Sequence, residues 1–115
     1  MIKPYRPGQD RDNAHGAKAE KRLAKRTGAR LTPASGALQG AKGDMFTDRF
    51  RIESKSTVKD SYRLPLDVLC KAADEASEQG EVGVLVIQFV MPDGRIRRQG
   101  AWVCLPEHVF KELLE

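Results

Sequence analysis

The sequence predicts a single α/β domain in which helices flank a mixed central β-sheet. Three observations predict this class. The chain has 115 residues, which is the length of one domain rather than two. Strand-like patterns alternate with helix-like patterns along the chain. Residues 82–91 are almost continuously apolar and β-branched, which is typical of a strand covered on both faces.

The first quarter of the chain is expected to hold an arm and one helix. Residues 1–13 mix proline, glycine and charged side chains with few apolar ones, so we predict a flexible basic arm, with the domain itself over 14–115. Good helix formers dominate residues 14–27, and Gly28 is a suitable helix end. Residues 30–44 hold three glycines and a proline, which predicts a short strand followed by a shaped loop.

Two strands are expected next, over residues 44–47 and 49–56, joined by a tight turn at Asp48. Side chains alternate between the two faces of a strand. In the second strand Phe50 and Ile52 therefore share one face, whereas Arg51, Glu53 and Lys55 share the other.

The second half of the chain reads as helix, strand, strand and helix. A helix is expected over 62–79, with Pro65 in its first turn, and a buried strand over 82–91. After a turn at 92–94, we predict a short edge strand at Ile96 and another strand over 101–105, in which Trp102 belongs to the core or to a dimer interface. A last helix starts at Pro106, and four apolar residues are expected to face inward: Val109, Phe110, Leu113 and Leu114.

Charge is unevenly distributed along the chain. Residues 1–30 hold nine basic and three acidic side chains, net +6, whereas residues 31–115 hold eleven basic and thirteen acidic ones, net −2. Clustered lysine and arginine favour a polyanion partner, because binding releases the counterions of the phosphates. A solvated surface helix explains the same charges equally well.

The composition also limits location and cofactor class. No apolar run approaches the roughly 20 residues that cross a bilayer, and the first residues lack the apolar core of a secretory signal. We therefore expect a cytoplasmic protein with no membrane partner. Two cysteines are too few for a disulfide framework or a four-cysteine metal site.

Asp44, Glu53 and Lys55 form the pattern with the most specific chemistry. A hairpin brings Asp44 beside the second strand, where Glu53 and Lys55 share a face. Two carboxylates with a backbone carbonyl, at the position of Ser54, suit Mg²⁺. The lysine ammonium beside them would orient a water molecule or stabilise developing negative charge. The plain alternative is an exposed Glu53–Lys55 ion pair of little consequence.

These residues give the chain a resemblance to the PD-(D/E)XK nuclease superfamily, and within it to Holliday junction resolvases of the archaeal type. The resemblance covers about residues 17–105. It rests on Gly43-Asp44 followed by Glu53-Ser54-Lys55 as the E-x-K element, continued by Ser56-Thr57. One departure is Gly43, which stands where the superfamily motif has proline.

The resemblance implies a restriction-endonuclease-like fold and further site residues. Glu20 would be the acidic residue of the first helix, with a catalytic role, and Ser35 would position phosphate. Lys42, Arg51 and Lys59 would contact the DNA backbone. The cofactor would be Mg²⁺, with Mn²⁺ as a substitute, and the protein would act as a homodimer.

We therefore expect a Mg²⁺-dependent, structure-specific DNA endonuclease that resembles a Holliday junction resolvase and hydrolyses phosphodiester bonds of branched DNA. Two other functions stay open. One is a restriction-type or repair-type endonuclease that cuts ordinary duplex. The other is a basic nucleic-acid-binding protein without catalysis, which leaves the two carboxylates unexplained, because carboxylates near phosphate weaken binding unless a cation lies between them.

Overall fold

The structure is a computed structural model that describes the backbone of residues 7–31 and 44–115, and the side chains of residues 15–31 and 45–115. In chain order its elements are α1 (Pro7–Thr27), β1 (Arg30–Leu31), β2 (Asp44–Phe46), β3 (Phe50–Thr57), α2 (Leu66–Glu78), β4 (Val82–Val90), β5 (Ile96–Cys104) and α3 (Glu107–Leu113).

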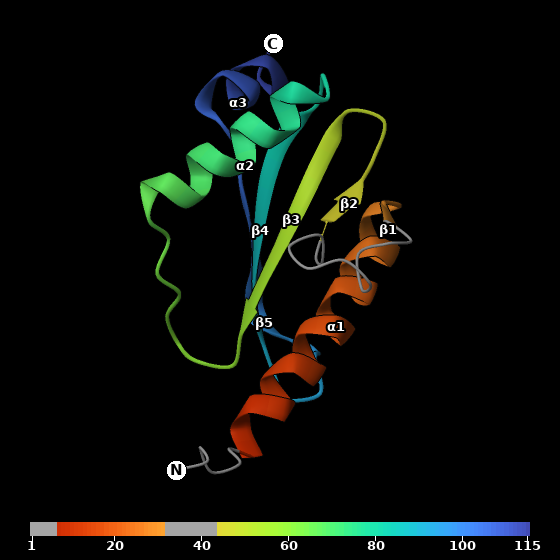
Figure 1. The fold of residues 1–115 in the computed structure, drawn as a ribbon, viewed down its shortest axis with the longest axis vertical. Helices are drawn as coiled ribbons and strands as arrows, with labels where there is room; N and C mark the ends of the chain where they lie inside the picture. The colour runs from red at the N-terminus through yellow and green to blue at the C-terminus, as the bar shows by residue number, and fades with distance from the viewer. Residues whose placement is uncertain (1–6, 32–43) are drawn as a thin grey trace, which may run out of the picture.

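The strands form one mixed sheet in the order β1-β2-β3-β4-β5. β3 and β4 pair in parallel, and all other neighbouring strands pair antiparallel. Parallel pairing requires a crossover connection, and the crossover between β3 and β4 contains α2 (Figure 1). The predicted α/β class with a mixed sheet between helices is thereby confirmed.

None of the helices in the described residues could cross a membrane.

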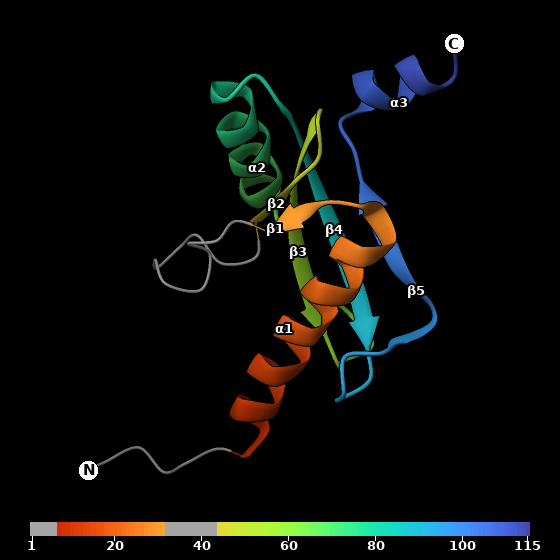
Figure 2. The same ribbon diagram turned by 90° about the vertical axis from the view of Figure 1, so that its right-hand side faces the viewer.

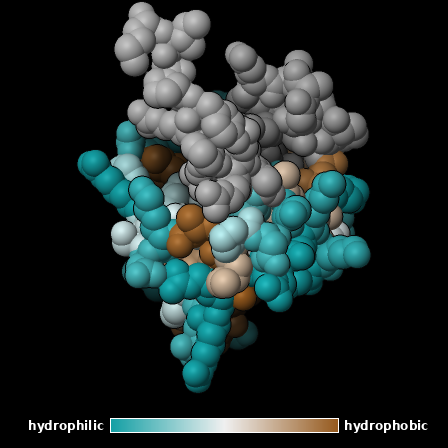
Figure 3. All heavy atoms as spheres, turned by 90° about the horizontal axis from the view of Figure 1, so that it is seen from below, coloured by the Kyte–Doolittle hydropathy of each residue, from teal (hydrophilic) through white to brown (hydrophobic). Residues whose placement is uncertain are grey.

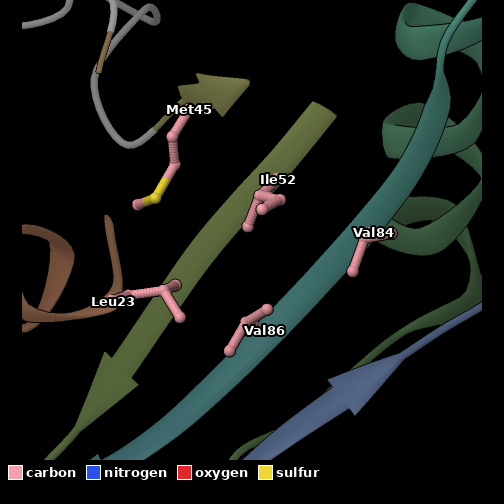
Figure 4. Packing of buried hydrophobic residues seen from close by; sticks show 5 residues of the cluster. All are labelled: Leu23, Met45, Ile52, Val84 and Val86. Carbon is pink, nitrogen blue, oxygen red and sulfur yellow. The ribbon is translucent and has the colours of Figure 1, made fainter. Parts of the chain in front are cut away.

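The helices α1 and α2 cover opposite faces of the sheet, as two perpendicular views show (Figures 1 and 2). On the α1 face, a buried apolar cluster joins the helix to three strands. Its side chains point toward one another (Figure 4), and they are Leu23, Met45, Ile52, Val84 and Val86. This cluster fixes the even-numbered residues of β3 and β4 on the α1 face.

The odd-numbered residues of the same two strands face α2. Arg51 of β3 forms an ion pair with Glu75 of α2 at 3.3 Å. In β4, Gly83 lies directly under the helix, where a Cβ atom would stand 2.4 Å from the backbone oxygen of Ala72. Only glycine permits this close approach of helix and strand.

Two helix starts differ from the sequence prediction. α1 begins at Pro7, so residues 7–13 of the predicted arm belong to the helix. Proline is favourable in a first helical turn, because its missing N–H would have no partner within the helix there. α2 begins at Leu66 rather than near residue 62, because Pro65 is its extended N-cap residue (φ −70°, ψ 152°).

The carboxyl-terminal region differs more. Residues 96–104 form one strand instead of two, with an irregularity between Gln88 and Val90 of its partner strand. In α3 only Val109 is buried, and the other three residues expected to face inward are exposed. Trp102 is 60% exposed and is therefore not a core residue of this chain.

The close helix–strand approach predicts opposite effects for two glycine substitutions. We expect Gly83→Ala to lower the free energy of unfolding by about 1–3 kcal/mol, because the added methyl group overlaps the backbone of α2. In contrast, Gly16→Ala in α1 meets only Ser56 Oγ at 3.7 Å, so it should raise stability by about 0.5–1 kcal/mol. Urea denaturation of both variants measures the difference, and equal effects would contradict the packing described here.

Candidate functional site

The β2–β3 hairpin sets Asp44 directly opposite Glu53. The Thr47 N–H donates to the Phe50 carbonyl at 2.9 Å, so positions 47 and 50 form a hydrogen-bonded pair. Bonded and non-bonded pairs alternate along an antiparallel ladder, which makes 44 and 53 a non-bonded pair. In such pairs the Cα atoms lie about 4.5 Å apart, and the two positions share one face of the sheet. The hairpin thus brings two carboxylate-bearing positions together.

Glu53 and Lys55 lie on the face of β3 that is turned toward α2, two residues apart and therefore about 7 Å along the strand. Both side chains are half-buried. Neither forms an ion pair within the described part of the chain, although other charged side chains on this face do. The exposed Glu53–Lys55 ion pair that the sequence left open is therefore absent from the described residues.

The half-buried Glu53 lies among side chains of β3 and α2. Around Glu53 the structure places the side chains of Arg51, Ala72 and Glu75, which line a small pocket with it. The Arg51 guanidinium forms an ion pair with Glu75 at 3.3 Å and lies 5.9 Å from the ring of Phe46.

The backbone of Ser54 supplies an oxygen at the same place. The Val82 N–H donates to the Arg49 carbonyl, so odd-numbered backbone groups of β3 point to β4 and even-numbered ones point to the β2 side. Ladder pairing with β2 ends at Glu53. The Ser54 carbonyl therefore lies at an edge that no strand of the described residues covers.

The Ser54 side chain points to the other face and belongs to a buried polar network around Gln88. This glutamine is fully buried, its Nε2 donates to Ser54 Oγ at 3.0 Å and to the Ala19 carbonyl at 3.4 Å, and its Oε1 accepts from Arg26 Nη2 at 2.8 Å. Partial burial lowers the pKa of Arg26, but a guanidinium starts from so high a value that it keeps its charge. The network fixes the residue between Glu53 and Lys55.

A second polar contact joins α1 to β3. The buried His15 approaches Ser56 Oγ with its Nδ1 at 3.2 Å. Sequence reasoning missed both Gln88 and His15 as supports of the site. The signal for Gln88 was visible as the one amide in an otherwise apolar strand, whereas nothing local in the sequence marks His15 as a partner of Ser56.

The remaining predicted site residues lie apart from the Asp44–Glu53 pair or outside the description. Glu20 belongs to α1, which packs on the face of the sheet opposite Glu53. The catalytic role of Glu20 stays a prediction. Lys59 lies exposed in the loop after β3. Ser35 and Lys42 fall outside the described residues.

Chemically, the hairpin offers hard oxygen ligands and one amine. In the described residues, no group of three or more histidine, cysteine, aspartate or glutamate side chains is placed to hold a metal ion. A site at positions 44 and 53 would therefore depend on two carboxylates, the Ser54 carbonyl and ligands from water or substrate.

Comparison of the chain with protein families, with curated proteins and with solved structures finds no match.

The polar network predicts a stability loss for Gln88→Leu. Leucine fills a similar volume but leaves Ser54 Oγ, the Ala19 carbonyl and the Arg26 guanidinium without this partner. We expect the free energy of unfolding to fall by about 1–3 kcal/mol, the cost of unsatisfied buried polar groups. The exposed Gln79→Leu is the matched control and should change stability by less than about 0.5 kcal/mol. Urea unfolding of both proteins tests this, and similar effects would show that the network adds nothing.

Proposed function

We propose that this protein is a Mg²⁺-dependent DNA endonuclease of the PD-(D/E)XK type, acting on branched DNA as a Holliday junction resolvase does. The observation that carries the proposal is the direct pairing of Asp44 with Glu53, with the half-buried Lys55 two residues further along the same face. Two carboxylate-bearing positions and an amine on one face are groups that can hold a divalent cation and stabilise charge on a phosphate.

In this proposal each residue has a separate task. Asp44, Glu53 and the Ser54 carbonyl would hold the ion, whose chemistry there would be to make a water molecule more acidic and to neutralise charge on the phosphate. The Lys55 ammonium orients the attacking water and stabilises negative charge on the phosphoryl oxygens. The Gln88 network keeps Ser54, and therefore its two neighbours, in a fixed rotation about the strand axis.

DNA binding would use cations outside the catalytic pair. The outer side of α1 carries exposed lysines, among them Lys21 and Lys25, that form no ion pair within the described residues. The end of the molecule where β3 runs into the loop with Lys59 presents mainly hydrophilic side chains (Figure 3). Contacts of this kind bind the phosphate backbone and read little sequence.

Three substitutions test the proposed site. We expect Asp44→Asn, Glu53→Gln and Lys55→Ala each to lower the rate of Mg²⁺-dependent cutting at least about a hundredfold, because each removes a ligand or a charge that acts on the reacting phosphate. Binding to a labelled four-way junction in EDTA should persist in all three. Glu78→Gln and Lys111→Ala change matched, exposed side chains and should leave the rate unchanged.

Substrate comparison completes that experiment. The wild-type protein is incubated with labelled four-way junction, duplex and single strand, with Mg²⁺, Mn²⁺ or EDTA. Preferential cutting of the junction supports the proposal, whereas preferential cutting of duplex indicates a restriction-type or repair-type enzyme. Binding without cutting under every metal condition contradicts catalysis and leaves a nucleic-acid-binding protein.

Salt dependence tests the role of the first helix. Counterion release predicts a linear fall of log K with log salt concentration, with a slope of about 0.9 for every phosphate contact. Removing Lys21 and Lys25 together by alanine substitution should therefore make the slope shallower by up to about 2. Lys71→Ala in α2 is the control, since its side chain already faces Glu75 at 3.8 Å. Fluorescence anisotropy in EDTA measures the slopes, and an unchanged slope would exclude α1 from the DNA contact.

A further inference from the structure

A polar cavity lies where β3 ends and the loop to α2 begins. Its volume is about 400 Å³, within the roughly 300–1,000 Å³ that ligand sites occupy. Ligand sites of sheets with parallel strands lie outside the carboxyl ends of those strands, and β3, which pairs in parallel with β4, ends here (Figure 1). The lining of this strand-end cavity is mostly polar and includes Ser56, Thr57, Lys59, Ser61, Arg63 and, from α1, His15.

Two cations line the strand-end cavity without an acidic partner. Lys59 and Arg63 are exposed, and neither forms an ion pair within the part of the chain that the structure describes. Asp60, which lies between them in sequence, is bound to Arg97 at 2.8 Å. Among the described residues, no aspartate or glutamate lines the cavity. Its two positive charges therefore favour an anionic ligand.

Hydroxyl groups lie beside these cations, and contacts from behind hold two of them in place. Ser56 Oγ lies 3.2 Å from Nδ1 of His15, a residue that is only 3% exposed. Thr57 Oγ1 accepts the backbone N–H of Lys59 at 3.0 Å, and an accepted hydrogen bond leaves this hydroxyl its own hydrogen to donate. The cavity thus combines positioned hydroxyls with two cations, which suits an anion that has several acceptor oxygens.

We propose that the strand-end cavity binds a terminal phosphate group, which is a phosphomonoester. Such a group carries about −1.5 to −2 charges at pH 7 and three acceptor oxygens. Lys59 and Arg63 match its charge, and the three serine and threonine hydroxyls of the lining match its oxygens. An internal phosphate of a DNA strand carries one charge and has two free oxygens, so it would leave part of the lining unused.

The strand-end cavity is separate from the proposed metal site. Thr57 stands four residues beyond Glu53 on β3, which is about 13 Å along the strand. Lys55, the proposed catalytic amine, does not line the cavity. Binding of a terminal phosphate therefore does not depend on the proposed nuclease activity. The group has two sources, which are the phosphorylated 5′ end of a DNA strand and a free nucleotide.

Titration of the isotope-labelled protein, followed by NMR in EDTA at constant ionic strength, tests the cavity directly. The ligands are inorganic phosphate, deoxyadenosine 5′-monophosphate and, as the control without phosphate, deoxyadenosine. We expect saturable shifts of the backbone amides of residues 56–63 with the first two ligands and none with deoxyadenosine. Oligonucleotides with and without a 5′-phosphate then distinguish the sources. A DNA end as ligand predicts tighter binding of the phosphorylated strand, whereas a free nucleotide as ligand predicts equal binding of both strands.

Variants separate the cavity from general attraction of anions. Lys59→Ala combined with Arg63→Ala should weaken binding of inorganic phosphate at least about tenfold, because hydrogen bonds to charged groups are the strong ones. Arg98→Ala combined with Lys111→Ala removes the same charge from exposed positions outside the cavity and should bind phosphate as the wild type does. Ser56→Ala changes no charge and should weaken binding about threefold to tenfold.

Three results would overturn the proposal. They are shifts that do not saturate with phosphate, shifts with deoxyadenosine equal to those with its monophosphate, and an equal loss of binding in the two double variants. Urea unfolding checks that each variant is folded. Because neither Mg²⁺ nor cutting enters the measurement, failure of this site and absence of nuclease activity are told apart.

Discussion

The alternation of side chains along β3 is the constraint on which the rest of the structure depends. Even-numbered residues of this strand face α1, where Ile52 enters the apolar cluster and Ser54 and Ser56 accept polar contacts. Odd-numbered residues face α2, which leaves Glu53 and Lys55 on a separate surface. A slip of one residue would exchange the two sets and place both charged side chains in the core.

The buried Gln88 shows how this register is protected. Apolar packing alone tolerates a shifted strand if volumes match, whereas a buried amide with several partners has one favourable arrangement. Gln88 binds Ser54 of the adjacent strand and two groups of α1, so helix and strand are aligned by the same side chain. The polar contacts therefore specify the relative position of helix and strand in addition to stabilising it.

Local patterns predicted the parts of the fold that depend on local rules. Three such parts are visible in the sequence itself: the turn at Asp48, the alternation in β3 and the apolar run of β4. The pairing of Asp44 with Glu53 follows from the turn and from the strands on either side of it. Exposure at the carboxyl terminus could not be predicted in this way. An apolar stripe such as Phe110 and Leu113 indicates that a helix covers something, but it does not say whether the partner belongs to the same chain.

The placement of the candidate site within one hairpin has a consequence for how the molecule divides its tasks. Every proposed ligand and the amine come from twelve consecutive residues, 44–55, so closing this unit costs little chain entropy. The proposed chemistry is therefore modular, because every group that it needs belongs to this one hairpin. Substitutions in β5 and α3, which lie outside residues 44–55, can accumulate without changing any of the proposed ligands.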